Sequence, residues 1–407
     1  MPERLSTTLP CGMQVVAERT PSRAVYCGIV VKAGTRHEEL ADTGMAHFVE
    51  HMTFKGTRRR TARQINGLLE RRGGDIGAFT SKQETVYYAQ VMPEDFALAA
   101  DLLCDMVFCS TYPQAEIDKE AEVICDEIES YRDAPAELIF DDFESRLFPG
   151  SPLGRDVLGD ADRLRTYTTA DALRFVRRYY TPANCVFYAC GDITAAHVVR
   201  ALTAATRTLS PVAIDKAEPP VVPAAPFMHR AEKGTHQAHV VVGAPVFGGD
   251  DARHTTLQLL NNLLGGPATN SRLNLALRER AGLVYTVDSY ASCYPDIGLW
   301  VVYFGCDAHD TERCLRLVRR ELARLADSPL PLRTLQAAQR QLVRQTRLAC
   351  DNYESHALAF GKAFAHYGRH RDINRFCNEV EAVTPESLHA VAAEFLAPSR
   401  LSTLIYA

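Results

Sequence analysis

Two histidines and a glutamate with the spacing of metal-site residues occur early in the chain. His47, Glu50 and His51 form the pattern H-x-x-E-H, and the apolar residues around them have helical spacing. On a helix, the two histidines lie one turn apart on the same face, where both imidazoles can bind one tetrahedral ion. Glu50 borders the same position and is suited to act as a general base on zinc-bound water. The pattern therefore predicts a zinc site with its own base, against the alternative of a helix with incidental surface histidines.

A third ligand has to come from another element. Residues 114–131 have the period of a helix with an apolar stripe, and Glu120 and Glu127 project beside that stripe from nearly the same face. A carboxylate at the edge of a core needs a partner, and a metal ion is one such partner. Glu122 and Glu129 point toward the other flank, where we expect them to be solvated. Spacing alone does not decide whether Glu120 or Glu127 is the ligand. The alternative is that neither binds a metal and that both belong to ion pairs or to an exposed helix edge.

The elements that must position these residues occur twice. A helix, a proline-containing turn and a strand follow one another at 168–190 and again at 384–407, which indicates an internal repeat. We therefore place a first domain at 1–208 and a second at 227–407. The linker at 209–226 is rich in proline, alanine and valine and has no helical period. Alternating strands and long helices predict an α+β fold in which each duplicated domain is a sheet covered by helices.

Composition excludes several other classes. The 407 residues carry a net charge of −5, without the basic excess of a nucleic-acid-binding protein. The basic run at 58–60 is expected to be a solvated face or helix end, with a substrate-attracting wall as the alternative. Twelve scattered cysteines without a C-x-x-C pair favour buried thiols in a reducing compartment. The N-terminus lacks an apolar segment and no run of about 18 apolar residues follows, so we expect a cytoplasmic protein without membrane contact.

The residues around both candidate ligand helices resemble the pitrilysin family of inverted-motif zinc peptidases, which includes insulin-degrading enzyme and mitochondrial processing peptidase. The segment 51–57 matches the usual continuation of the family motif, and 120–127 matches the family's second helix. The resemblance places Glu127 at the ligand position and Glu120 where a carboxylate supports the site. It implies a zinc endopeptidase that binds one Zn²⁺ per subunit through His47, His51 and Glu127.

A second block, at 271–285, resembles the arginine–tyrosine motif of the same family. It implies that Arg278 and Tyr285 contact the substrate backbone and stabilise the tetrahedral intermediate, for which a guanidinium and a phenol are suitable donors. From the residues alone, Tyr285 would be a core aromatic and Arg278 a charge on a helix surface. The chain length resembles the two-domain branch, in which two subunits close into a chamber around unfolded peptides. We therefore expect a homodimer in which Arg278 and Tyr285 act on the partner's metal site.

The chain departs from the family pattern at Gly77, where asparagine commonly precedes the alanine. Gly77, Ala78 and Phe79 still lie in a strand that can pair with an extended peptide, so we expect them to bind substrate. In the second copy, residues 261–265 read Asn-Asn-Leu-Leu-Gly in place of the histidine motif. This difference predicts a single metal site per subunit.

A rival hypothesis from another class is a non-catalytic structural subunit, similar to the respiratory-complex core proteins that share this fold. Such relatives generally lose the metal ligands, whereas both histidines and both glutamates are present here. The sequence therefore favours the peptidase.

Overall fold

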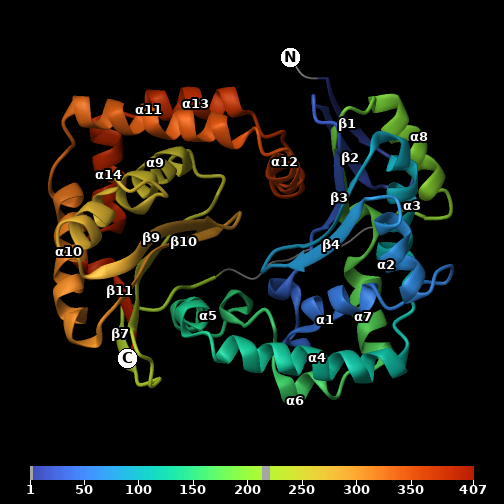
Figure 1. The fold of residues 1–407 in the computed structure, drawn as a ribbon, viewed down its shortest axis with the longest axis horizontal. Helices are drawn as coiled ribbons and strands as arrows, with labels where there is room; N and C mark the ends of the chain where they lie inside the picture. The colour runs from blue at the N-terminus through green and yellow to red at the C-terminus, as the bar shows by residue number, and fades with distance from the viewer. Residues whose placement is uncertain (1–2, 213–220) are drawn as a thin grey trace. The chain divides into compact units, whose positions relative to one another are not determined.

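Two β-sheets organise the chain, each in its own compact unit (Figure 1). The computed structural model describes residues 3–212 and 221–407, so the middle of the expected linker at 209–226 lies outside the described residues. The first unit combines Met1–Glu129, Arg155–Pro219 and Cys350–Arg371. The second combines Ser130–Gly154, Pro220–Ala349 and Asp372–Ala407. The two units therefore interleave along the sequence.

The first unit is built on a six-stranded sheet. Its strands, in spatial order, are β1 (Arg4–Thr8), β2 (Gln14–Arg19), β6 (Cys185–Gly191), β3 (Val25–Val31), β5 (Thr85–Val91) and β4 (Asp75–Thr80). β2 and β6 are parallel, and the other neighbours are antiparallel. β4 pairs only with β5 among the described strands and therefore forms an edge of the sheet.

The five-stranded sheet of the second unit repeats this topology. Its spatial order is β7 (Met228–Ala231), β11 (Ser402–Tyr406), β8 (Ala238–Phe247), β10 (Ile297–Cys306) and β9 (Val284–Cys293). β7 and β11 are the one parallel pair, as β2 and β6 are in the first sheet. The same order and strand directions confirm the predicted α+β class with duplicated, helix-covered sheets.

Helices cover one face of each sheet and enclose a large apolar cluster there. In the first unit these are α1 (Met45–Thr53), α2 (Ala62–Glu70), α3 (Phe96–Cys109), α4 (Gln114–Arg132), α6 (Ala161–Leu164), α7 (Thr169–Tyr179) and α8 (Ala195–Ala205). In the second they are α9 (His254–Gly265), the short π-helix η6 (Asn274–Glu279), α10 (Thr311–Asp327), α11 (Leu332–Ala349), α13 (Ile373–Ala382) and α14 (Pro385–Phe395). Within the described residues, none of these helices combines the length and apolar character needed to cross a bilayer.

The opposite face of each sheet is covered by a helix from the other half of the sequence. α5 (Pro135–Leu147) packs through Ile139 and Phe143 on the second sheet, in a cluster with Val241 and Leu404. α12 (Tyr353–Tyr367) packs on the first sheet against valines and Tyr188. The sequence analysis did not anticipate this exchange of helices between the two repeats.

Most cysteines lie inside these packed layers. Cys109, Cys293 and Cys350 are half-buried and all the others are buried. Burial raises the pKa of the Cys27 thiol to about 12, so at neutral pH this cysteine is a small apolar core residue.

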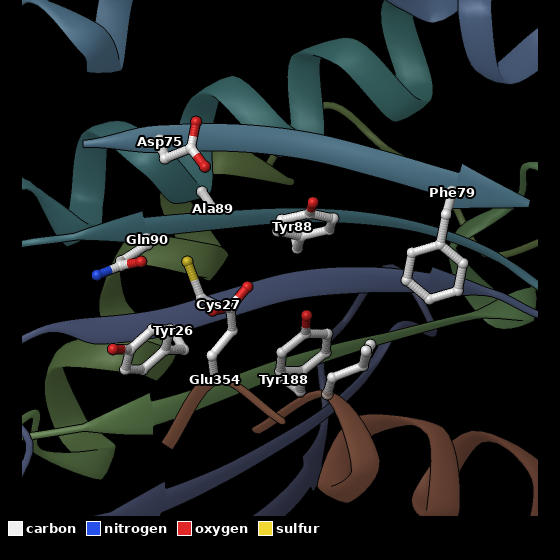
Figure 2. Close-up of a pocket in the computed structure, with 10 residues that line it drawn as sticks. Tyr26, Cys27, Asp75, Phe79, Tyr88, Ala89, Gln90, Tyr188 and Glu354 are labelled. Atoms are coloured by element: carbon white, nitrogen blue, oxygen red, sulfur yellow. The ribbon is translucent and has the colours of Figure 1, made fainter. Parts of the chain in front are cut away.

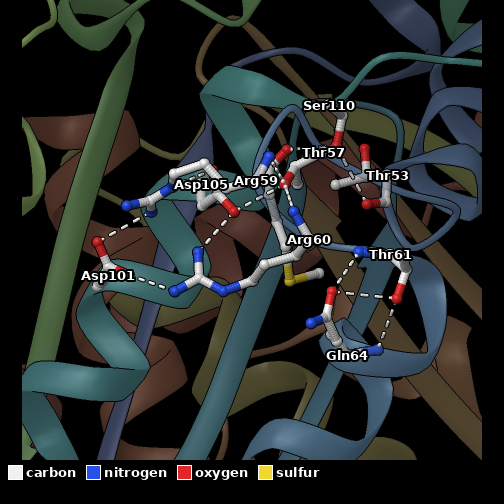
Figure 3. Close-up of polar contacts among 10 residues, drawn as sticks. Thr53, Thr57, Arg59, Arg60, Thr61, Gln64, Asp101, Asp105 and Ser110 are labelled. Atoms are coloured by element: carbon white, nitrogen blue, oxygen red, sulfur yellow. Dashed lines mark hydrogen bonds and ion pairs between the residues drawn. The ribbon is translucent and has the colours of Figure 1, made fainter.

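Two arginines of the basic run at 58–60, Arg59 and Arg60, are held by acidic side chains (Figure 3). Arg60 Nη1 lies 2.6 Å and Arg59 Nε 3.0 Å from the carboxylate of Asp105 on α3, which is fully buried. Both arginines also pair with Asp101. A buried carboxylate requires such partners. These two arginines therefore fix the loop after α1 and contribute little as a substrate-attracting wall.

Ion pairs attach α12 to the first sheet. Glu84, 3% exposed, accepts hydrogen bonds of 2.7 Å from both Lys362 and His366 of α12. At the other end of the sheet, His356 Nε2 lies 3.0 Å from Glu18 Oε1. Burial alone would raise the pKa of Glu84, but the hydrogen bond from His366 and the charge of Lys362 lower it to about 2. The ionised carboxylate is thus strongly favoured in the folded protein.

We predict that Glu84→Gln lowers the free energy of unfolding of the first unit by about 3 kcal/mol at neutral pH, because Lys362 and His366 lose their ionised hydrogen-bond partner. A depressed carboxyl pKa contributes stability above its unfolded value of 4.5, and this contribution is lost as the pH falls toward about 2. Urea denaturation between pH 7 and 2.5 should show a smaller loss of stability on acidification for the variant than for the wild type. The exposed Glu94 provides a matched control, and equal pH dependence of Glu84→Gln and wild type would contradict the prediction.

Candidate metal centre

The helix that carries the histidine motif begins at a capped, glycine-dependent turn. Gly44 precedes α1 with φ +83°, and a Cβ there would lie 2.8 Å from Gly159 Cα, so this turn requires glycine. The buried carboxylate of Glu38 accepts hydrogen bonds from Gly44 N (2.9 Å) and Ala46 N (2.8 Å). These bonds satisfy backbone donors that a helix N-terminus leaves open. Glu38 and the two glycines therefore set where α1 starts.

α1 presents His47 and His51 on one side, facing α4. The imidazole centroids are 4.5 Å apart. Glu127 Oε2 lies 3.9 Å from His47 Nε2 and 3.7 Å from His51 Nε2. One ligand atom from each of the three residues lies within 4.8 Å of the other two. The side chains that helical spacing placed on facing sides of two helices therefore lie close together in the structure.

This arrangement fits a zinc ion. Bonds of about 2.0–2.1 Å to a tetrahedral ion hold its ligand atoms roughly 3.4 Å apart, close to the separations found between Glu127 and the two histidines. His47 Nε2 is too far from Glu127 for a hydrogen bond, and among the described residues its buried Nδ1 has no hydrogen-bond partner either. Burial and the neighbouring His51 lower the pKa of His47 to about 3. The neutral imidazole, with a lone pair on one ring nitrogen, is the form that binds a metal.

Glu120 orients the second histidine. Its Oε1 lies 3.0 Å from His51 Nδ1, so a proton held on Nδ1 leaves Nε2 directed at Glu127. Lys55 Nζ lies 2.5 Å from the other oxygen of Glu120. Although burial disfavours the charged form, hydrogen bonds from His51 and Lys55 lower the pKa of Glu120. Of the two carboxylates that spacing left open, Glu127 approaches both histidines and Glu120 supports one of them.

Glu50 occupies the same side of α1 and is 8% exposed. Thr80, at the end of strand β4, donates a 2.7 Å hydrogen bond to its Oε2 and leaves Oε1 available. Burial raises the pKa of Glu50, and the charge of Glu127 acts in the same direction, while Thr80 and His51 oppose it. A carboxylate whose proton affinity is increased in this way is suited to accept a proton at neutral pH.

Several supporting groups were missed in the sequence analysis. Glu38 holds the start of α1, Lys55 pairs with Glu120 and Thr80 donates to Glu50. These contacts depend on how strands and loops pack. For Glu38, the signal in the sequence was an acidic residue shortly before a glycine and a helix start. Nothing in the local pattern marked Thr80. Glu122 pairs with Arg165 at 2.9 Å on the exposed flank of α4, where solvation was expected.

Arg278 and Tyr285 lie in the second unit on exposed positions. Arg278 is in η6, half exposed, and Tyr285 is the second residue of strand β9, with 82% of its surface exposed. The alternative that Tyr285 is a core aromatic is therefore wrong. Gly77, Ala78 and Phe79 lie on the edge strand β4, which ends at Thr80 next to Glu50.

The second copy has an amide where the first has a metal ligand. Asn261 on α9 accepts a 3.0 Å hydrogen bond from the indole of the buried Trp300, and its backbone carbonyl accepts one from Ser289. This asparagine ties α9 to the sheet. The other described group with metal-ligand types, Asp307, His309 and Asp310, is mostly exposed before α10 and includes a His309–Asp310 ion pair of 3.3 Å.

Comparison with known proteins identifies the family. Residues 14–161 match the family described as Insulinase (Peptidase family M16), and residues 166–342 match the Peptidase M16 inactive domain. The chain belongs to peptidase family M16. An uncharacterized zinc protease of Streptomyces coelicolor is 35% identical over 399 residues, which cover 96% of this chain and 86% of that protein. The uncharacterized zinc protease YmxG of Bacillus subtilis is 31% identical over 402 residues, covering 97% and 96%. This M16 member thus has zinc protease relatives along nearly its whole length.

Solved structures share the complete fold of this M16 member. A protease from Helicobacter pylori has a TM-score of 0.93 at 20% identity, with all of both chains covered. A putative M16-like peptidase from Alicyclobacillus acidocaldarius has a TM-score of 0.88 at 18% identity and covers 100% of this chain and 98% of its own. The resemblance inferred from the motifs is therefore confirmed for family and fold.

We predict that Glu120→Gln weakens zinc binding about 10–100-fold, because His51 loses the carboxylate that orients its ring. Competition with a chromogenic chelator measures the affinity directly. Glu122→Gln, on the exposed side of the same helix, is the matched control and should bind zinc as the wild type does. Equal affinities of the Glu120 and Glu122 variants would show that Glu120 has no role at the site.

Proposed function

We propose that this protein is a zinc-dependent endopeptidase that hydrolyses unfolded peptides, with Glu50 as the general base. The observation that carries the proposal is the meeting of His47, His51 and Glu127 beside a buried Glu50 whose pKa is raised. The zinc protease relatives support the same class of chemistry. A rival non-catalytic subunit would have no use for this combination of ligands and base.

In the proposed mechanism, an extended peptide adds to the edge of β4 along Gly77, Ala78 and Phe79, which brings its backbone to the end of the strand beside Glu50. A zinc ion held by the two histidines and Glu127 would polarise the scissile carbonyl and lower the pKa of the attacking water. Glu50 accepts the proton of that water on Oε1, because Thr80 holds Oε2. Glu50 then passes the proton to the leaving amine.

The negative charge that develops on the oxygen of the scissile carbonyl requires hydrogen-bond donors that α1 and α4 do not supply. The exposed guanidinium of Arg278 and the exposed hydroxyl of Tyr285 are suited to stabilise the oxyanion. We infer that they do so across a homodimer that closes into a chamber. A closed chamber would admit unfolded chains and exclude folded proteins, which present few extended backbones.

Glu50→Gln should retain zinc and lower the turnover of a quenched, unstructured peptide by about 10²–10⁴-fold, because the base is lost and the ligands remain. Peptide cleavage and zinc content are measured on the same preparation. Equal cleavage by both proteins would exclude Glu50 as the base. Zinc retained by an inactive wild type would favour the structural-subunit hypothesis.

Action across the dimer predicts complementation between two inactive variants. Tyr285→Phe should lower turnover about 10²–10³-fold by removing an oxyanion donor. Random mixing with Glu50→Gln subunits by co-expression should restore about a quarter of wild-type turnover, since half of the dimers then contain one complete site. If both groups act within one subunit, the mixture stays as inactive as its parents.

A further inference from the structure

A cavity of about 150 Å³ lies on the face of the first sheet that α12 covers (Figure 2). Four aromatic side chains line it, each from a different strand: Tyr26, Phe79, Tyr88 and Tyr188. Glu354 and Leu358 of α12 complete the lining, and Figure 2 shows the Glu354 carboxylate rising between the rings of Tyr26 and Tyr188. A cavity of this volume holds a benzene-sized group.

Glycines make room for two of these rings. A Cβ on Gly77 would lie 2.6 Å from the Tyr88 hydroxyl, so the ring of Tyr88 leans across β4 where any larger residue would displace it. A Cβ on Gly361 of α12 would lie 2.4 Å from the ring of Tyr188. At both positions, therefore, the absence of a Cβ leaves space for an aromatic ring of the cavity wall.

The charge of the cavity is negative. Its charged lining residues, Asp75 and Glu354, are both acidic. Burial and the carboxylates of Asp75 and Glu354 raise the pKa of Tyr88. Lys362 lies 5.7 Å from the centre of the Phe79 ring, but its charge is paired with Glu84 at 2.7 Å. The dipole of α12 favours an acid in its first turn, which accounts for Glu354 but not for Asp75 on a strand.

The cavity adjoins the edge strand to which substrate is proposed to bind. Asp75 pairs with Gln90, Gly77 with Tyr88 and Phe79 with Val86, so alternate residues of β4 face α12 while Thr80 faces Glu50 on the opposite side. A peptide strand added to β4 would likewise direct every second side chain toward the cavity. The same strand therefore joins the cavity to the proposed site of cleavage.

We propose that this cavity binds the arginine or lysine side chain of a peptide paired with β4, on the N-terminal or C-terminal side of the bond to be cleaved. Aromatic faces attract a cation, and the two carboxylates neutralise it. A planar guanidinium also stacks on tyrosine rings, so arginine is favoured over lysine. The proposal rests on the proposed function and adds a charge preference to it at a distance from the reacting atoms.

Binding to the zinc-loaded Glu50→Gln protein tests the preference without turnover. Fluorescein-labelled peptides of one neutral sequence carry arginine at successive positions, each matched by a citrulline peptide of the same shape without charge. Fluorescence anisotropy should find at least one position where arginine binds about tenfold more tightly than citrulline. Adding Glu354→Gln and Asp75→Asn should bring this ratio close to one. Asp351→Asn, an exposed acid just before α12 that does not line the cavity, is the matched control and should retain the ratio.

Two results would overturn the proposal: equal binding of arginine and citrulline at every position, or a preference that persists without Asp75 and Glu354. Citrulline-peptide binding shows that each variant retains its folded strand edge, so a reduced ratio is not misread as unfolding. Cleavage of the citrulline peptides by wild type tests the proposed function separately. Cleavage without a charge preference would leave the peptidase in place and remove only the cavity's role.

Discussion

The hydrogen bond between His51 Nδ1 and Glu120 Oε1 joins the two helices on which the candidate centre depends. α1 supplies two imidazoles and a base, but it cannot supply a third ligand from the same face. α4 supplies Glu127 only if its register against α1 is fixed, and the 3.0 Å bond to Glu120, about two helical turns before Glu127, fixes it. Lys55 keeps Glu120 charged, so the orienting contact is also an electrostatic one. A metal site assembled from two helices has no tolerance for a shift of one residue.

Strand β4 connects this centre to the rest of the first sheet. Its last residue, Thr80, holds one oxygen of Glu50, and its unpaired edge offers backbone groups to an extended chain. Its other face contributes Asp75 and Phe79 to the aromatic cavity, and Gly77 leaves room there for the ring of Tyr88 on β5. This short strand therefore has to hold Glu50, offer its edge to a peptide and form part of the cavity wall. These three constraints explain why it has a glycine in its middle, although glycine is entropically unfavourable in a strand.

Local patterns predicted the elements and the two histidine ligands, and the family resemblance assigned Glu127 as the third, while long-range packing determined the remainder. Helical spacing brought His47, His51 and Glu127 to the right faces, because the positions of side chains on a helix follow directly from its period. Spacing could not choose between Glu120 and Glu127, since both lie on that face. Residue type alone would place Tyr285 in a core, and its exposure follows from its place near the start of β9. The contact between Thr80 and Glu50 has no local signal, because it is fixed by packing between elements.

The exchange of α5 and α12 is another feature that local sequence patterns could not predict. Its physical reason lies in how each sheet is covered. Each repeat contains the strands and the inner helices of its own sheet, but the apolar residues on the sheet's second face find their partner in the other half of the sequence. For the first sheet, Val16, Val30 and Val86 would face water without α12, and the buried Glu84 would lose both of its hydrogen-bond partners on that helix. Glu354 and Leu358 of the aromatic cavity come from that same helix. The first unit, with its candidate metal centre, therefore requires residues from both ends of the chain, and the repeat that appears as a domain in the sequence is not a unit that can bury its own sheet.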